Sequence, residues 1–344
     1  MRVALVGAGA IGRTHVDAVL HTGGVTLAGV ADPFDAGAHL AAQSGAVHYR
    51  DHRALIDAER PDAAIIATPN ELHVPQALDF VEAGIPVLVE KPIAGSLDEA
   101  RRLVAASESR GVPVLVGHHR RYHPVMVRAK EIIASGELGR IVAASATYFL
   151  AKPDDYFDIP WHRTPGAGGT FLINLIHEID LLRHLIGEVT AVSAMSSSAV
   201  RGLDVEDTGA VSFAFASGAL GSLVISDAVA GPWSWDLTAG DSPRFPAHGV
   251  ESHRIGGTEA SLTVPTLELW RHDGPREWTT EMHPVRQHVA ASSPYAEQLR
   301  HFADVVSGRA EPLVSGREGA QNLAVLDAIV TAAQTGATVE VIPV

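Results

Sequence analysis

Residues 2–12 of this 344-residue chain, RVALVGAGAIG, carry the strongest indication of its fold. Its apolar half, Val3–Val6, predicts a strand, and Ala10–Leu20 predicts a helix that begins directly after the glycines. Gly7, Gly9 and Gly12 form a GxGxxG pattern. The first glycine permits a tight turn, the second lets a pyrophosphate approach the backbone, and the third allows close helix–strand packing. With phosphate-binding amides at the helix N-terminus, the stretch predicts a dinucleotide-binding unit.

Asp32 strengthens this prediction. It lies 20 residues after Gly12 and just past the second predicted strand, Val25–Ala31. A carboxylate at that place can accept hydrogen bonds from both ribose hydroxyls of a dinucleotide, and it repels a 2′-phosphate. NAD is therefore favoured as the cofactor, and NADP stays an alternative because neighbouring loops can override one carboxylate. An ordinary glycine-rich turn is the competing interpretation of the motif.

The first 120 residues alternate short apolar runs with helical stretches, which predicts a doubly wound parallel sheet in a domain of residues 1–120. Further strands are expected at Ala63–Ala67, Val87–Val89 and Val114–Val116, and further helices at Asp35–Gln43, Pro75–Ala83 and Leu97–Ser109.

Beyond Pro124 the pattern changes, and residues 121–344 predict an α+β domain with an open, mostly antiparallel sheet. Strands are expected at Arg140–Leu150, Val189–Val200, Asp207–Ala216, Ala219–Ala228 and Trp233–Ala239, with a hairpin in 260–280. Helices are expected at Val125–Ala134, Phe171–Ile186, Tyr295–Val306 and Arg317–Thr335.

Composition excludes several classes of protein. The 26 Lys and Arg residues stand against 40 Asp and Glu, a formal net charge of −14, so we expect no nucleic-acid partner and no anionic membrane surface. The chain has no cysteine, which removes disulfides, thiolate nucleophiles and cysteine-based zinc sites. No apolar run has the length of a membrane span or the layout of a signal peptide, so a cytoplasmic protein is expected.

Polar residues follow two of the predicted parallel strands. Thr68 and Asn70 come after one strand, and Glu90 and Lys91 follow the next. The carboxyl ends of parallel strands form the ligand-binding edge of such sheets. Lys91 could hold a substrate oxygen there or stabilise a developing alkoxide, and a surface lysine before a proline turn is the alternative.

The predicted helix Phe171–Ile186 carries Asn174, His177 and Asp180 at spacings of three, which places them along one side. Histidine suits proton transfer near neutral pH, although a structural histidine explains the same pattern. Asp180 is expected to anchor a hydrogen-bond network. The 18 histidines show no HExxH spacing, and arginines interrupt the cluster in 118–123, so no metal site is predicted.

The glycine loop, ATPN (67–70), EKP (90–92), GHHRRYHP (117–124) and GGTFLINLIHEIDLLRHLIGE (168–188) occur in this order. With them the chain resembles the Gfo/Idh/MocA oxidoreductase family over nearly its whole length. The glycine loop is shared by many families, whereas EKP followed about 80 residues later by a GG…HxxD helix is more specific. The resemblance implies a Rossmann domain and an α+β domain whose open sheet forms homodimers or homotetramers. It also implies that the terminal helices pack back on the first domain.

The resemblance also implies roles for individual residues. Lys91 matches a lysine that contacts the reacting oxygen, and His177 matches an acid/base histidine. Many relatives carry Asp four residues before this histidine, where this chain has Ile173, so Lys91 is expected to share the proton transfer. The cofactor would be held by Gly7, Gly9, Ile11, Gly12 and Asp32 on the adenosine and pyrophosphate side, and by Thr68, Asn70, His73 and Glu90 on the nicotinamide side.

The loop 154–164 is expected to shape the substrate pocket with Trp161, His162 and Arg163, and Asn174 could hydrogen-bond a substrate hydroxyl. The expected function is hydride transfer between nicotinamide and a secondary hydroxyl or carbonyl of a sugar, cyclic polyol or related small molecule. Three alternatives stay open: a redox-neutral NAD-dependent glycosidase, a dihydrodiol dehydrogenase, and a non-catalytic NAD-responsive binding protein.

Overall fold

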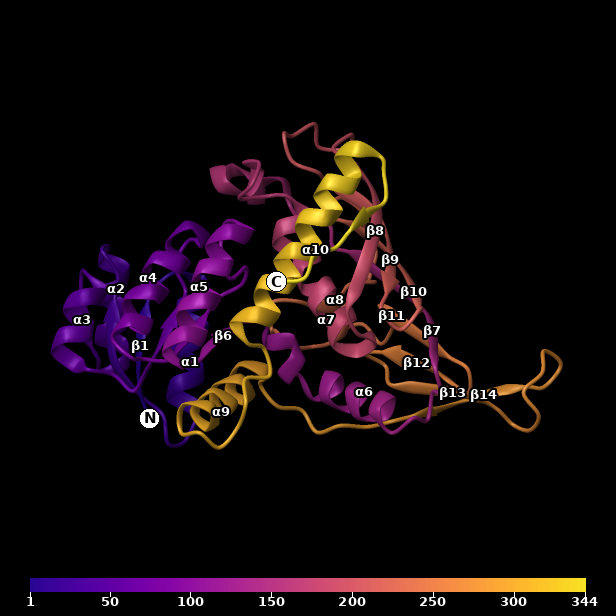
Figure 1. Cartoon of the computed structure of the whole chain (residues 1–344), viewed down its shortest axis with the longest axis horizontal. Coiled ribbons are helices and arrows are strands. Elements are labelled where there is room, and N and C mark those ends of the chain that lie inside the picture. The colour runs from indigo at the N-terminus through magenta and orange to yellow at the C-terminus, as the bar shows by residue number, and fades with distance from the viewer. The chain divides into compact units, whose positions relative to one another are not determined.

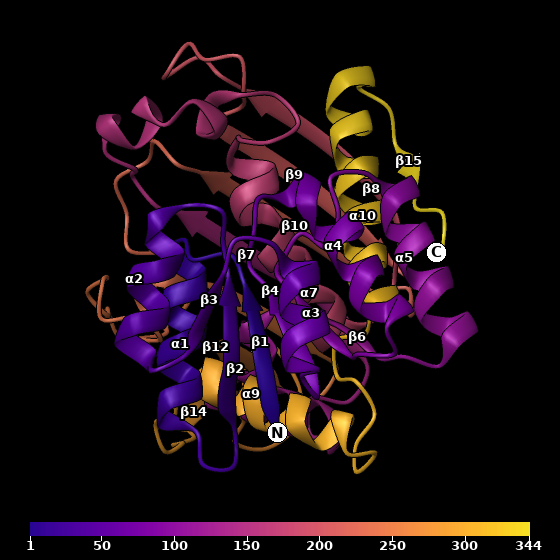
Figure 2. The same ribbon diagram turned by 90° about the vertical axis from the view of Figure 1, so that its left-hand side faces the viewer.

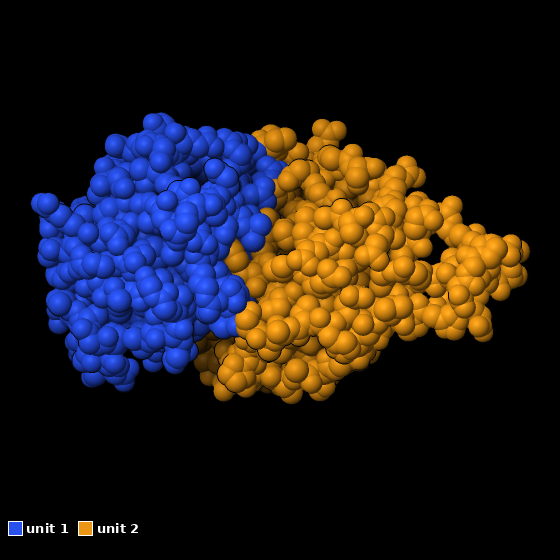
Figure 3. All heavy atoms as spheres, turned by 90° about the horizontal axis from the view of Figure 1, so that it is seen from below, with its two compact units in different colours: residues 1–119, 293–323, 344 blue, residues 120–292, 324–343 orange.

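The structure, a computed structural model, describes residues 1–344 and divides them into two compact units. Unit 1 comprises residues 1–119, 293–323 and 344, and unit 2 comprises residues 120–292 and 324–343 (Figure 3). The positions of the two units relative to each other are not determined. Late in the chain, helix α9 (Pro294–Val306) belongs to unit 1, whereas α10 (Gly316–Thr335) contributes residues to both.

Unit 1 is built on a parallel sheet of six strands in the order β3-β2-β1-β4-β5-β6. From β1 the strand order continues through β2 to β3 on one side and through β4 and β5 to β6 on the other. Doubly wound folds bind ligands where the order changes direction, which here lies between β1 and β4. The predicted doubly wound sheet is confirmed. Its strands are β1 (Arg2–Val6), β2 (Thr26–Ala31), β3 (Val47–Tyr49), β4 (Ala63–Ile66), β5 (Val87–Val89) and β6 (Val114–Val116).

Helices cover both faces of this sheet (Figure 2). On one face, α1 packs against α2 and α9, and Leu299 and Phe302 of α9 join the strand side chains in one apolar core. On the other face, α4 packs between α3 and α5. These helices are α1 (Ala10–His21), α2 (Asp35–Ser44), α3 (His52–Glu59), α4 (Asn70–Glu82) and α5 (Leu97–Arg110).

Two short elements of unit 1 escaped the sequence prediction, and one boundary was wrong. Strand β3 has three residues, none of them buried, and α3 buries only Leu55, so neither shows a clear apolar period. Helix α4 begins at Asn70 rather than at Pro75, which lies inside it. Proline indicates a helix start only as a tendency, because in the second turn it removes a single backbone hydrogen bond.

Unit 2 is built on a nine-stranded sheet in the order β14-β13-β12-β11-β7-β10-β9-β8-β15 (Figure 1). Every neighbouring pair is antiparallel except β7 with β10, so the prediction of a mostly antiparallel sheet is confirmed. The strands are β7 (Ile141–Phe149), β8 (Val189–Ser197), β9 (Thr208–Phe215), β10 (Leu220–Ser226), β11 (His253–Gly257), β12 (Ser261–Val264), β13 (Glu268–His272), β14 (Met282–Arg286) and β15 (Val339–Glu340).

Helices α6 (Pro124–Ala134) and α7 (Ile176–Ile186) pack against this sheet through an apolar core that includes Leu262 of β12. Trp235 lies fully buried in the same core. The prediction of a strand at Trp233–Ala239 was wrong, because α8 (Trp235–Thr238) is a single helical turn there. Ser234 caps this turn by accepting a hydrogen bond from the Leu237 amide, which an alternating apolar pattern does not reveal. None of the helices combines the length and the hydropathy of a membrane span.

Replacing Phe302 by alanine tests the assignment of α9 to unit 1. The Phe302 side chain is fully buried in the core that α9 shares with the parallel sheet. Its removal leaves a cavity, so the free energy of unfolding should fall by about 3–5 kcal/mol. Leu20→Ala is the control, because Leu20 is 56% exposed and its loss should change stability by less than about 0.5 kcal/mol. Equal small effects in chemical denaturation would contradict the assignment.

Candidate active site

The glycine loop of unit 1 is tightly packed at Gly7 and Gly12 and faces open space at Gly9. A Cβ on Gly7 would lie 2.5 Å from the Ala67 carbonyl oxygen, and one on Gly12 would lie 2.1 Å from the Gly7 carbonyl oxygen. Gly7 also has a φ of +98°, which favours glycine. A Cβ on Gly9 would meet nothing within 4 Å. The loop is thus held tightly against β1 and β4 and leaves open space where the backbone at Gly9 can approach a phosphate.

Asp32 follows β2 directly and binds the glycine loop. Its Oδ2 accepts a hydrogen bond of 2.7 Å from the Ala8 amide, and its Oδ1 accepts one of 2.9 Å from the Phe34 amide. Each carboxylate oxygen has a further lone pair, so the group can also accept from ribose hydroxyls. The carboxylate thereby holds the loop in place and puts a negative charge beside it. Ile11 packs against the apolar core beside it.

His73 of α4 connects the loops that follow β4 and β5. Its buried ring lies 2.8 Å from the Thr68 carbonyl oxygen through Nε2 and 2.8 Å from the Pro92 carbonyl oxygen through Nδ1. Burial lowers the pKa of His73, although both contacts are with carbonyl acceptors and favour the charged ring. Thr68 donates through its hydroxyl to Gln76, and Asn70 is the first residue of α4. His73 therefore holds the backbone of both loops, at Thr68 and at Pro92.

Glu90 is the first residue after β5 and is 4% exposed. Its Oε1 lies 2.7 Å from Nε2 of His15, and its Oε2 accepts a hydrogen bond of 3.2 Å from the Lys91 amide. Burial by itself raises the pKa of Glu90, but the His15 hydrogen bond and the nearby His15, His119 and Lys91 charges bring the pKa below its usual range. Glu90 is therefore a buried, ionised carboxylate next to Lys91, which is itself half-buried.

In unit 2 the helix predicted at Phe171–Ile186 is in two parts. Residues Phe171–Leu175 form one π-helical turn, and α7 continues from Ile176. The prediction of one regular helix over Phe171–Ile186 was therefore wrong in its first five residues, because a π turn has more residues per turn than an α-helix. Asp180 forms a buried ion pair with Arg121, with oxygen–nitrogen distances of 2.7 and 2.9 Å. Single π turns like Phe171–Leu175 are frequent at functional sites.

The Asn174 amide is held from both sides by residues that the sequence did not single out. Its Nδ2 donates a hydrogen bond of 2.7 Å to the Tyr148 hydroxyl, and its Oδ1 accepts one of 2.7 Å from Nζ of Lys152. Tyr148 in turn donates to Asp236, and burial raises its pKa well above the usual value. Only the alternation of β7, which points Tyr148 inward, could have indicated this contact.

This chain of contacts continues through the interior of unit 2. Asp236 accepts a hydrogen bond of 3.0 Å from Arg120, which also donates to Glu178 at 2.7 Å. The other carboxylate oxygen of Glu178 lies 2.8 Å from Nε2 of His253. Burying a polar group without a partner costs free energy, so this series of contacts fixes the geometry of the residues around the π turn.

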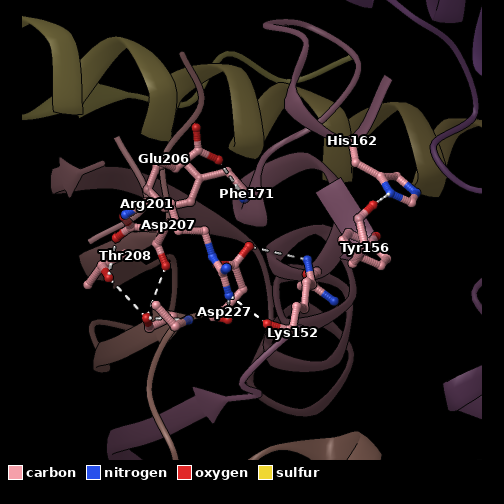
Figure 4. A network of polar contacts seen from close by, with 12 residues as sticks. Lys152, Tyr156, His162, Phe171, Arg201, Glu206, Asp207, Thr208 and Asp227 are labelled. Carbon is pink, nitrogen blue, oxygen red and sulfur yellow. Dashed lines mark hydrogen bonds and ion pairs between the residues drawn. The ribbon is translucent and has the colours of Figure 1, made fainter. Parts of the chain in front are cut away.

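Lys152 lies in the loop after β7 and also contacts Asp227, the residue that follows β10 (Figure 4). Its ammonium lies 3.5 Å from Oδ2 of Asp227 and 4.9 Å from the centre of the Tyr156 ring. Arg201 donates to the same Asp227 carboxylate at 2.8 Å. Burial lowers the pKa of Lys152, and the opposite charge of Asp227 works against that shift. Lys152 is thus a largely desolvated amine in contact with a residue of the candidate site.

The loop with the predicted pocket residues contains two short 3₁₀ helices, η2 (Asp154–Asp158) and η3 (Pro160–Arg163). The His162 ring stacks on Tyr156 with ring centres 3.7 Å apart, and its Nδ1 lies 2.5 Å from the Tyr156 carbonyl oxygen (Figure 4). Burial lowers the pKa of His162. Trp161 and Arg163 are exposed, whereas His162 is buried. The stacked pair therefore gives this loop a defined shape.

The predicted site residues are divided between the units. The glycine loop, Asp32, Thr68, Asn70, His73, Glu90 and Lys91 lie in unit 1, and Trp161, His162, Arg163, Asn174 and His177 lie in unit 2. Within unit 1 the structure brings the loops that carry Thr68 and Lys91 together through His73. No group of three His, Asp or Glu side chains is arranged to hold a metal ion.

Replacing Tyr148 by phenylalanine tests the hydrogen-bond chain around Asn174. The buried Asn174 amide would lose its acceptor and Asp236 would lose a donor, so the free energy of unfolding should fall by about 1–3 kcal/mol. Tyr49→Phe is the matched control, because it removes a hydroxyl hydrogen bond to Glu59 from a partly exposed place where water can replace it. Thermal melting of both variants measures the difference in stability between them. Equal melting temperatures would argue against a stabilising role of the hydrogen bonds around Asn174.

Comparison with known proteins agrees with this geometry. The Gfo/Idh/MocA model described as "Oxidoreductase family, NAD-binding Rossmann fold" matches residues 1–118, and the model described as "Oxidoreductase family, C-terminal alpha/beta domain" matches residues 130–341. A 1,5-anhydro-D-fructose reductase of Ensifer adhaerens is 29% identical over 345 residues, which cover 99% of this chain and 98% of the relative. An inositol 2-dehydrogenase of Rhizobium meliloti is 28% identical over 337 residues and 96% of each chain.

Among solved structures, the WlbA dehydrogenase of Bordetella pertussis, in complex with NADH and UDP-GlcNAcA, superposes with a TM-score of 0.82 and 26% identity. The match covers 100% of this chain and 99% of that one. Both halves of the sequence thus match one family, and the first model's description agrees with the doubly wound parallel sheet of unit 1. The chain belongs to the Gfo/Idh/MocA family of NAD(P)-dependent oxidoreductases.

Proposed function

We propose that this protein transfers hydride between NAD and a secondary hydroxyl or carbonyl of a sugar, cyclic polyol or related small molecule. The observation that carries the proposal is the glycine loop, which is open at Gly9 and tied through Ala8 to the Asp32 carboxylate. This arrangement fits a dinucleotide without a 2′-phosphate. The names of the relatives, a reductase of an anhydro sugar and an inositol dehydrogenase, support the substrate class.

Lys91 and His177 carry the proton chemistry in this proposal. When bound, NAD supplies the hydride acceptor, and NADH supplies the donor for the reverse reaction. His177 takes the proton of the substrate hydroxyl during oxidation, and the Lys91 ammonium stabilises the negative charge that develops on the same oxygen. In the reduction direction the Lys91 ammonium can give a proton to the same oxygen and so share the proton transfer with His177, since Ile173 supplies no carboxylate to the histidine.

The polar contacts of unit 2 support a substrate pocket around Asn174. One amide hydrogen of Asn174 bonds to Tyr148, so one hydrogen is left to donate to a substrate oxygen. The Lys152 ammonium fixes the orientation of the amide, because it can bond only to Oδ1 and so leaves Nδ2 to face Tyr148. We place His162, with its exposed neighbours Trp161 and Arg163, at the wall of the same pocket.

Absorbance of reduced nicotinamide tests this function, with NAD and NADP supplied separately across a panel of sugars, inositols and aromatic dihydrodiols. Steady NADH formation with one sugar or polyol class is the expected result. Formation only with dihydrodiols would move the substrate class to aromatic diols. Release of a sugar from a glycoside without net NADH formation would identify a redox-neutral glycosidase. NAD binding without turnover of any substrate would favour a binding protein.

Replacing His177 by alanine tests the proposed acid/base residue. Loss of a general acid/base group should lower kcat by about 100-fold or more, while the Kd for NAD stays nearly unchanged because unit 1 binds the cofactor. His184→Ala, on the same helix, is the control and should keep normal turnover. A matching loss of NAD affinity in the His177 variant would count against the assignment.

Asp32→Ser tests the cofactor preference. Without the carboxylate, the ribose hydroxyls lose a charged acceptor and a 2′-phosphate is no longer repelled. We expect kcat/KM for NAD to fall by about tenfold or more, and the ratio of NAD to NADP activity to fall further. Asp35→Ser is the matched control, since this exposed carboxylate lies on α2 close to Asp32 in sequence. An unchanged NAD to NADP ratio in Asp32→Ser would rule out this role.

A further inference from the structure

Glu90 is the only carboxylate of unit 1 that is buried, and groups from other elements of the unit surround it. His15 reaches it from α1, at an Nε2–Oε1 distance of 2.7 Å, and is itself 2% exposed. On the β6 side, a Cβ on Gly117 would lie 2.7 Å from the carboxyl carbon. Because Gly117 has no side chain, the Glu90 carboxylate fits against the backbone there.

Helix α9 encloses this pair from a part of the chain far away in sequence. The Tyr295 ring meets the His15 ring edge-on, with centres 5.6 Å apart and an angle of 87° between the planes. His119 stacks on the Tyr295 ring, with ring centres 4.4 Å apart. The aromatic contacts restrict the His15 ring to an orientation in which Nε2 points at Glu90.

Stability alone does not account for such a pair. Burying a carboxylate costs free energy even when a hydrogen-bond donor faces it, so its presence here calls for another explanation. The location supplies one: Glu90 begins the loop after β5, at the ligand-binding edge of the sheet, and is followed by Lys91. The nicotinamide ring is positively charged in NAD⁺ and neutral in NADH. A fixed negative charge at that edge therefore stabilises the oxidised cofactor more than the reduced one.

We propose that His15 and Glu90 form an electrostatic pair that sets the relative affinity of the protein for NAD⁺ and NADH. Glu90 supplies the negative charge, and His15 is a positioning residue that keeps this carboxylate ionised and oriented without touching the cofactor. The inference rests on the proposed function, because it requires that the nicotinamide ring binds at this edge. It adds that α1, which holds the pyrophosphate at its N-terminus, also tunes the redox end of the cofactor through its second turn.

The experiment measures the Kd of the whole protein for NAD⁺ and for NADH by calorimetry, in the wild type and in Glu90→Gln, His15→Leu and the double variant. Glu90→Gln should raise the Kd for NAD⁺ on the order of tenfold and leave that for NADH within about twofold. His15→Leu should have the same effect, because a buried carboxyl without its donor takes up a proton. The double variant should add nothing further, since both changes remove one charge.

Two further variants separate this role from a structural one. His15→Gln keeps a neutral donor and should preserve the wild-type ratio of the two Kd values, even if His15→Leu fails to fold. His21→Gln, on the exposed end of the same helix, should change neither Kd. Equal weakening of NAD⁺ and NADH, or additive effects in the double variant, would overturn the proposal. Wild-type protein that binds neither cofactor would instead overturn the proposed function.

Discussion

The direct passage of β1 into α1 is the constraint on which the rest of unit 1 depends. Gly12 lies so close to the Gly7 carbonyl that no side chain fits between them, and a side chain on Gly7 would likewise collide with the carbonyl of Ala67, which follows β4. This close packing aligns the N-terminus of α1 with the carboxyl ends of the central strands. Once it is in place, Asp32 can reach the Ala8 amide and His15 can reach Glu90, because both contacts depend on the position of α1 and its loop.

Unit 2 depends on a different interaction, a continuous chain of buried polar contacts. The chain runs from Lys152 through Asn174 and Tyr148 to Asp236, and then through Arg120 to Glu178. A buried polar group that loses its partner is costly, so each member constrains the next. The apolar contacts of α7 fix its distance from the sheet, whereas the polar chain fixes its rotation and the orientation of the Asn174 amide.

The predictions that held and those that failed differ in the range of the interactions involved. Each helix and strand with a long apolar period was found within a few residues of its expected bounds, because burial of one face selects the element. The one-turn helix α8 and the π turn at Phe171–Leu175 were missed. A single cap by Ser234 decides the first, and the Glu206 contact with the Phe171 amide supports the second, so neither follows from periodicity.

By itself, the sequence determined the NAD-binding architecture of unit 1, the order of the main elements and the family. Glycine spacing and apolar periodicity report local sterics and burial, which act within about 10–20 residues. Only the tertiary structure decided that Lys152 and Tyr148 hold Asn174, and that α9 brings Tyr295 against His15. These contacts join residues 22, 26 and 280 positions apart, and side-chain pairing over such separations is set by the packing of whole elements rather than by any local pattern.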